Sequence, residues 1–440
     1  MGSYNDPFGG REIVKVQGII LVVSLCVLNL APCVSAGELT NVVNKSRLTG
    51  GVLLLVNAGD EIYDEAGATG CTVRGLETDP EAVDTLRKRF LVRGVYGKLS
   101  VTPFDGKTLP CIDNLVNLVL VDEARLDMNE VMRVLAPGGT ALIRKTTDWE
   151  TFVKPWPEEM DEWNQYLHDA DNNGVASDSA GPPERLQWTG GSVFGRTKTA
   201  MPSVTSMVTN NGRVFTVEDV ATTEVGTLPK RYVLLARDAF NGCELWRHPL
   251  KEWDKEKSAP VKDISVQLQR RILAVGGKVY CTDGFDGPIT VFDGATGKIL
   301  STFRNTENTR EFAHSDGVVF GIQGEPFATG VVPGRTKFKD VKIDDVKLFA
   351  LDAETGERLW QLSIVGADGY IGGTRSVKGK YLTYLTRQRL FSRNSPTGNA
   401  HWSPRNSYCA DMPLKNHFRS GYHTTPPTIY MHYHRTVCVS

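Results

Sequence analysis

A short motif that recurs four times limits what this chain can fold into. Its clearest copy is residues 348–360, LFALDAETGERLW, in which an alternating apolar run leads into a turn and then to Trp360. Asp352 can hold the turn amides and Gly356 can take a positive φ, so the motif predicts two antiparallel strands joined by a tight turn. A two-stranded unit cannot bury its apolar face alone, and a recurring one therefore predicts sheets that pack on each other.

The other copies keep the same register along the chain. They are residues 234–246 (LLARDAFNGCELW), 289–300 (ITVFDGATGKIL) and 390–402 (LFSRNSPTGNAHW). The turn glycines are 55, 59 and 42 residues apart, which suits one four-stranded sheet per repeat. We expect well-ordered sheets near 200–250, 270–325 and 340–365, and a poorly packed chain after about 385.

The D-A-x-T-G-x-x-L-W form resembles the pyrroloquinoline-quinone-type (PQQ-like) repeat of β-propellers, over about 188–402. This repeat occurs in quinoprotein dehydrogenases and in a lipoprotein of outer-membrane protein assembly. The resemblance implies that Trp246, Trp360 and Trp402 pack between blades. Since the chain has room for four or five blades, we expect a partial propeller, an open arc whose exposed strand edges favour association with a partner.

A quinone cofactor is the weaker alternative for these repeats. Quinoprotein dehydrogenases hold the quinone with a pair of adjacent cysteines, and no two of the eight cysteines here are adjacent. The cysteines also lack the C-x-x-C spacing of a zinc module, so the sequence predicts no metal site. Pyrroloquinoline quinone, in a quinone-dependent oxidoreductase, remains an alternative.

Residues 50–147 alternate between strand and helix signals. Apolar runs predict five strands, and helices are expected from Asp79 to Gly94 and over 128–135. Together they predict a doubly wound α/β layer with five parallel strands, which the chain leaves at Lys145. The five strand segments are 51–57, 71–77, 98–103, 114–122 and 140–145.

The order of these signals is similar to that of class I S-adenosylmethionine-dependent methyltransferases, and RVLAPGG (133–139) matches the segment before the fifth strand. The resemblance implies three cofactor-binding residues: Gly59 in the loop after the first strand, Glu77 on the ribose hydroxyls, and Asp105 near the adenine. The loop departs from the pattern, because it keeps a single glycine and Glu61 stands where the family has another.

Two interpretations of this layer stay open. In the first it no longer binds S-adenosylmethionine, and the chain is a non-catalytic scaffold. In the second it is a working methyltransferase that uses S-adenosylmethionine. Catalytic residues cannot be assigned in either.

The two ends and the connection between the halves complete the predicted organisation. Residues 1–36 have the basic, apolar and small-residue regions of a signal peptide, which predicts a periplasmic or secreted protein without a transmembrane span after cleavage. Residues 148–187 are expected to be a linker with a short helix over 157–170. The polar cluster 168–173 could ligate a hard cation or form a turn, and the turn is favoured. An irregular tail is expected over 403–440.

With a formal net charge of −1, the protein has no overall positive field to attract a polyanion, so we expect no nucleic-acid partner. A protein or cell-surface partner is the expectation instead. The sequence does not name that partner.

Overall fold

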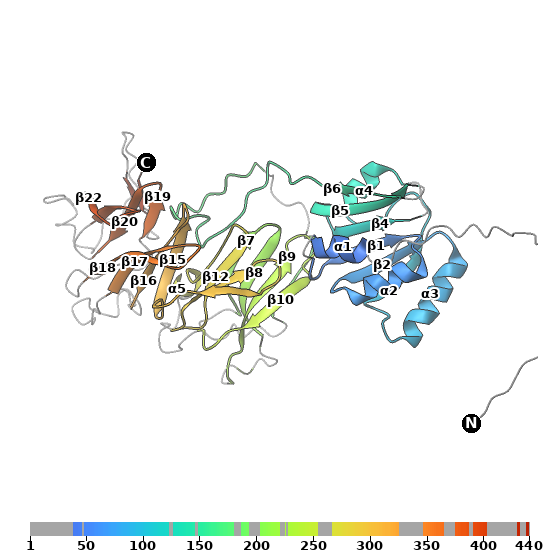
Figure 1. Ribbon diagram of the computed structural model, residues 1–440, viewed down its shortest axis with the longest axis horizontal. Coiled ribbons are helices and arrows are strands. Elements are labelled where there is room, and N and C mark those ends of the chain that lie inside the picture. Colours follow the sequence, from blue (N-terminus) through green and yellow to red (C-terminus); the bar gives the residue numbers. More distant parts are fainter. Residues whose placement is uncertain are drawn as a thin grey trace, which may run out of the picture.

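A computed structural model describes the chain in two parts, an α/β layer and a row of antiparallel sheets (Figure 1). It describes residues 38–45, 48–122, 126–145, 148–179, 186–192, 203–220, 225, 228–253, 266–324, 346–364, 375–386, 390–402, 429–431 and 437–439. The predicted signal peptide, 1–36, lies outside these ranges.

The α/β layer has the parallel sheet that the sequence predicts. Strand order is β3-β2-β1-β4-β5-β6, and the first five strands in this order run parallel. The strands are β1 (Val52–Val56), β2 (Thr72–Glu77), β3 (Leu99–Pro103), β4 (Val116–Val121), β5 (Leu135–Lys145) and β6 (Asp148–Val153). The helices are α1 (Glu38–Lys45), α2 (Asp60–Ala68), α3 (Pro80–Val92) and α4 (Met128–Val134).

Local signals explain most of these boundaries. The Asp79 side chain accepts a hydrogen bond from the Glu81 amide at 2.9 Å, which starts α3 with a proline in its first turn. Strands β1 and β4 are almost fully buried, as their continuous apolar runs predict. Two apolar clusters cover the two faces of the sheet, one with α1, α2 and α3 and the other with α4.

The edge of this sheet differs from the expectation. The chain does not leave the sheet at Lys145, because β6 folds back and pairs antiparallel with β5. The assigned linker, 148–187, therefore begins with a strand of the α/β layer. The Pro-Gly-Gly segment expected to separate helix from strand lies inside β5, with Gly138 at a φ of +75°.

Four sheets of four antiparallel strands follow, one for each copy of the motif. The first has β7 (Val204–Asn210), β8 (Arg213–Asp219), β9 (Tyr232–Asp238) and β10 (Glu244–Pro249). The second follows α5 (Val266–Gln269) and has β11 (Ile272–Val275), β12 (Lys278–Thr282), β13 (Ile289–Asp293) and β14 (Ile299–Thr302). The third has β15 (Thr309–Ser315), β16 (Val318–Gln323), β17 (Val346–Asp352) and β18 (Arg358–Ile364). The fourth has β19 (Ser376–Lys378), β20 (Tyr381–Leu385), β21 (Leu390–Asn394) and β22 (Ala400–Trp402).

Two expectations about these sheets were wrong. Residues 309–323 belong to the third sheet rather than the second, because β16 pairs with β17 in register. The chain after 385 is not poorly packed throughout, since β20, β21 and β22 pair in a fourth sheet and Phe391 stacks on Tyr384 at 5.2 Å.

Each motif turn receives an aromatic ring from the preceding part of the chain. Trp246 donates from Nε1 to the Gly294 carbonyl at 2.9 Å, and its ring lies where a Cβ at Gly297 would be. Trp360 donates in the same way to the Ser395 carbonyl at 2.9 Å. The predicted packing of these two tryptophans between sheets is thus confirmed, while the Trp402 side chain lies outside the described residues.

Three further aromatic residues complete this series. Trp188, ahead of the first sheet, donates to the Ala239 carbonyl at 2.8 Å. The second sheet has no tryptophan in its motif. There Phe303 packs on Gly356, and the Tyr280 hydroxyl donates to the Ala353 carbonyl at 3.1 Å. In the second sheet, two residues therefore provide the ring contact and the hydrogen bond that a single tryptophan provides in the other cases.

Residues 161–173, which we call the strap, are irregular instead of helical, with turns at 166–167 and 170–171. In Figure 1 the chain leaves β6 and runs along the row of sheets. The strap bonds to the first strand of every sheet through the amides of Thr209, Ala274, His314 and Val377. Because these strands are sheet edges, the strap covers backbone groups that would otherwise be unpaired. The short helix predicted over 157–170 was therefore wrong.

The expected irregular tail contains one described pairing, between β23 (Ile429–Met431) and β24 (Val437–Val439). No helix among the described residues is long and apolar enough to cross a membrane.

Candidate functional site

The carboxyl edge of the parallel sheet brings the predicted site residues to one end of the layer. Glu77 is the last residue of β2, and the Phe104 amide donates to its carbonyl at 2.9 Å, so the turn with Asp105 begins beside it. Open α/β sheets bind ligands at this edge. The predicted position of Glu77 at a carboxyl strand end is confirmed, whereas its cofactor-binding role stays a prediction.

The Glu77 carboxylate already has a partner inside the protein. Tyr63 on α2 donates from its hydroxyl to Glu77 Oε1 at 2.6 Å. Tyr63 is fully buried and Glu77 is only 7% exposed. One oxygen of the carboxylate that the sequence assigned to the ribose hydroxyls is therefore engaged by a phenol.

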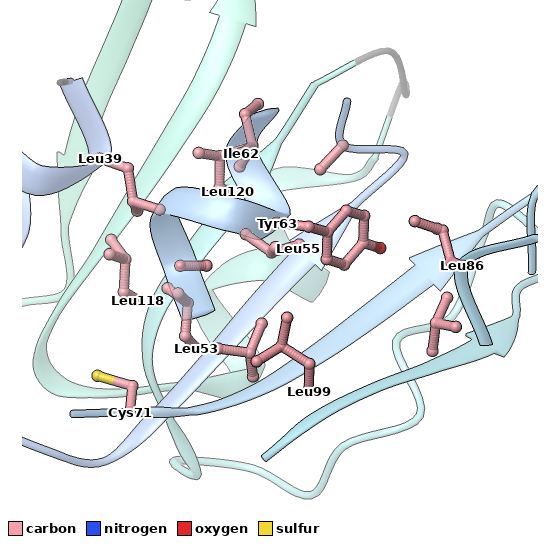
Figure 2. Close-up of a cluster of buried hydrophobic side chains, with 14 of the residues drawn as sticks. Leu39, Leu53, Leu55, Ile62, Tyr63, Cys71, Leu86, Leu99, Leu118 and Leu120 are labelled. Carbon is pink, nitrogen blue, oxygen red and sulfur yellow. The ribbon is translucent and has the colours of Figure 1, made fainter. Parts of the chain in front are cut away.

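The local sequence explains why Tyr63 reaches this carboxylate. Tyr63 lies on the buried face of α2 with Ile62 and Ala66, and Figure 2 draws its ring within the apolar cluster beneath the helix. The ring also packs on Phe90 of α3 at a centroid distance of 5.5 Å. Gly75 of β2 leaves room for it, because a Cβ there would lie 2.0 Å from the Tyr63 hydroxyl.

Burial dominates the electrostatics of this pair. It raises the pKa of Glu77, and the hydrogen bonds from Tyr63 and from the Ala58 amide offset it only in part. The negative charges of Asp122 and Asp60 raise the Glu77 pKa further. Burial, followed by the charge of Glu77, raises the pKa of Tyr63 as well, so the phenol remains a hydrogen-bond donor at neutral pH.

A second acid at this edge is also paired. Asp122 follows β4 and is 8% exposed. Its Oδ1 lies 2.7 Å from Nε of Arg144, which comes from β5 and stacks on Trp149 of β6 with its guanidinium 5.1 Å from the ring centroid. The carboxyl ends of β2 and β4, the two neighbours of β1, thus carry carboxylates engaged by side chains of the same layer.

The loop after β1 is held by its own contacts. Asn57 adopts a φ of +49°, a region that asparagine tolerates, and accepts hydrogen bonds from the amide and hydroxyl of Thr78 at 2.9 and 3.2 Å. Gly59 forms the N-cap of α2 at a φ of −66°, and a Cβ there would meet nothing within 4 Å. Glu61 is exposed on the first turn of α2. The side chain that engages the Glu77 carboxylate is therefore that of Tyr63, and not that of a loop residue such as Glu61.

Asp105 is exposed and belongs to a turn. Its Oδ1 accepts from the amides of Lys107 and Thr108 at 2.8 and 3.1 Å, and these bonds lower its pKa. Asp105 is available to solvent, but it forms no described hydrogen bond with the Glu77 side chain. The described residues hold no cluster of three or more His, Cys, Asp or Glu side chains able to bind a metal ion.

The strap contains the polar cluster that the sequence considered as a cation site. Asp169 and Asp171 accept amides two residues ahead at 2.8 Å each, and Asn172, at a φ of +60°, donates to the Arg375 carbonyl. These are turn contacts and a tie to the fourth sheet, which agrees with the turn interpretation.

The opposite, amino edge of the parallel sheet carries the interface with the first antiparallel sheet. Asn117, at the start of β4, accepts from the Val52 amide at 2.8 Å and donates to the Asp238 carboxylate at 2.7 Å. Asn241 donates to Asn117 Oδ1 at 2.8 Å. A cavity of about 260 Å³ lies beside this network, lined in part by Thr49, Thr140, Trp156, Phe240 and Leu245.

The sequence did not predict the residues that form the main contacts at the carboxyl and amino edges of the parallel sheet. Tyr63 was hidden because 57–61 was treated as a cofactor loop and the helix after it was not predicted. The Gly75 in β2 was an available signal, because a glycine inside a strand indicates close approach of another group. Arg144 and the contacts of Asn117 carry no local signal.

Comparisons with known proteins concern the α/β layer. No protein family model and no curated protein matches the sequence. Similar solved structures are a putative S-adenosylmethionine-dependent methyltransferase from Methanococcus maripaludis (18% identity, TM-score 0.22), a putative sarcosine dimethylglycine methyltransferase from Galdieria sulphuraria (18%, 0.23) and an S-adenosylmethionine-dependent methyltransferase from Aquifex aeolicus (17%, 0.22).

The matches cover 24% of this chain and 52%, 45% and 62% of those structures, respectively. At these TM-scores they say nothing about activity. The α/β layer of this chain is a mostly parallel sheet.

Proposed function

We propose that this chain is an exported, non-catalytic binding scaffold whose methyltransferase-like layer does not hold S-adenosylmethionine tightly. The observation that carries the proposal is the 2.6 Å hydrogen bond from Tyr63 to Glu77, with both side chains buried. A ribose would have to displace it. Because a hydrogen bond to a charged group is worth about 1.5–3 kcal/mol, this competition costs about tenfold in affinity or more.

The row of sheets supports the scaffold half of the proposal. Four sheets held by aromatic contacts and by the strap make a long surface of repeated units, which is a common platform for protein partners. The partner is a protein or a cell-surface component, and the location is the periplasm or the outside of the cell. Both follow from the sequence rather than from the structure.

Calorimetric titration of the full chain with S-adenosylmethionine tests the proposal. We expect no saturable heat, or a dissociation constant well above about 10 μM, which corresponds to ~7 kcal/mol of binding. A constant at or below that value would refute the inactive layer.

The second candidate is an S-adenosylmethionine-dependent methyltransferase. It is favoured by the mostly parallel sheet, with Glu77 at the end of β2. Tight binding in the titration would select this candidate. No contact of the described residues favours a quinone-dependent oxidoreductase. Binding of pyrroloquinoline quinone would be tested in a separate titration.

A further inference from the structure

A groove of about 490 Å³ lies where the second antiparallel sheet passes into the third. This volume is within the range of about 300–1,000 Å³ that is typical of ligand sites. Three of the seven residues that line the groove lie at 305–308, between β14 and β15, and the other four lie on β16, β17 and β18. All seven are polar or charged, so the groove suits a hydrophilic ligand and not an apolar one.

The loop side of the groove is held in place by backbone conformation and hydrogen bonds. Asn305 and Asn308 adopt φ values of +57° and +58°, a region that asparagine tolerates. Between them, Thr306 is fully buried and donates to the Phe303 carbonyl at 2.7 Å. The Gly324 amide donates to the Asn308 carbonyl at 3.1 Å. Because this wall is already ordered, a ligand would bind without the cost of fixing a loose loop.

The strand side of the groove is tied to the same loop. Gln323 donates from Nε2 to the Asn305 carbonyl at 3.0 Å, and Arg358 donates to that carbonyl at 2.6 Å. The Arg358 guanidinium also lies over the Phe349 ring, 4.8 Å from its centroid. Its contacts with Asn305, Gln361 and Gln323 use three of the five N–H donors of an arginine, which leaves two for a ligand.

The remaining charged groups of the groove define the ligand that it suits. Lys347 and Glu307 are exposed, and neither side chain forms a hydrogen bond or an ion pair with a residue that the structure describes. With Arg358, the groove has two cations against one carboxylate, so it favours a ligand that carries negative charge. The side-chain amides of Asn305 and Asn308 can donate to hydroxyl groups and accept from them.

We propose that this groove binds an acidic saccharide, a ligand of sugar rings that carry carboxylates. The ligand carboxylate lies against Arg358 and Lys347, and the ring hydroxyls bond to the amides of Asn305 and Asn308. The row of sheets thereby gains a cell-surface ligand. The inference rests on the groove alone, so tight binding of S-adenosylmethionine by the α/β layer would leave it standing.

Calorimetric titration of the full chain with a trimer of galacturonic acid tests the proposal. We expect saturable binding. Maltotriose has the hydroxyls without the carboxylates, and triglutamate has the carboxylates without the hydroxyls, so each should bind at least about tenfold more weakly. Absence of saturable binding by the acidic trimer would overturn the proposal. Equal binding of triglutamate would also overturn it, and would point to an acidic peptide instead.

Substitutions at Lys347 locate the binding to the groove. Lys347→Ala should weaken binding of the acidic trimer about tenfold, because it removes one of the two cations, whereas Lys347→Arg should keep the affinity. Lys298→Ala is the matched control, since Lys298 is exposed in the motif turn of the second sheet and does not line the groove. An unchanged affinity in Lys347→Ala, or an equal loss in Lys298→Ala, would contradict the proposal.

Discussion

The two edges of the parallel sheet use similar polar groups for opposite purposes. At the carboxyl edge, Glu77 and Asp122 are each engaged by a side chain of the same layer, Tyr63 and Arg144. At the amino edge, Asn117 is engaged by Asp238 and Asn241 from a different sheet. At the carboxyl edge, where ligands usually bind, both acids have partners within the layer. The amino edge connects the two parts of the molecule.

The largest effect is expected at the amino edge. Asn117→Ala removes the oxygen that accepts from the Val52 amide and from the Asn241 side chain. It also removes the donor to the Asp238 carboxylate, and Asp238 is only 6% exposed. Losing these three hydrogen bonds at a partly buried interface should cost about 3 kcal/mol of unfolding free energy. Denaturant unfolding measures the loss.

Asn129→Ala is the control for this change, since Asn129 is exposed on the first turn of α4. A loss for Asn117→Ala no larger than for this control would mean that the amino-edge network is not what holds the interface.

A smaller loss is expected at Gly75. In Gly75→Ala the new methyl group would lie 2.0 Å from the Tyr63 hydroxyl and 2.7 Å from its ring, so the ring must move away from Glu77. Overpacking of this kind costs about 1–3 kcal/mol. Thermal unfolding of the variant measures the cost.

Gly59→Ser provides the comparison, because a side chain at the N-cap of α2 meets open space and serine is a good cap. If Gly75→Ala proved as stable as wild type, the tight fit of Tyr63 against β2 would be wrong.

The smallest effect concerns pH. Since burial raises the pKa of Glu77, the carboxyl takes up a proton more readily in the folded chain than in the unfolded chain. Its contribution to stability is present below the ordinary glutamate pKa and is lost as the pH rises through the raised value. Relative to Glu77→Gln, which keeps an acceptor for Tyr63, wild type should lose stability between acidic and neutral pH. Unfolding free energies of both proteins across that range check the sign, and a wild type that gains stability relative to Glu77→Gln as the pH rises would contradict it.

The sequence predicted the parts of the fold that local patterns determine. Asp79 starts α3 as expected, and the motif turns at Asp293 and Asp352 accept the same turn amides. The strap was misjudged for a physical reason. Its apolar spacing is helical, but Trp163 bonds to Thr209 of the first sheet and Tyr166 lies against Arg270, so long-range contacts override the local preference.

The candidate site was predictable only in its position. That Glu77 ends a strand follows from the apolar run before it, whereas its engagement by Tyr63 depends on how α2 lies against β2. Contacts between Asn117 and Asp238 join residues 121 positions apart and leave no pattern in either segment.

The most direct test of the closed carboxyl edge is a paired calorimetric titration of wild type and Tyr63→Phe with S-adenosylmethionine. Phenylalanine keeps the buried ring but removes the hydroxyl that donates to Glu77 Oε1. We expect weak or undetectable binding by wild type and binding about tenfold tighter, or newly measurable, by Tyr63→Phe. Tight binding by wild type, or no gain in affinity on removing the hydroxyl, would contradict the account.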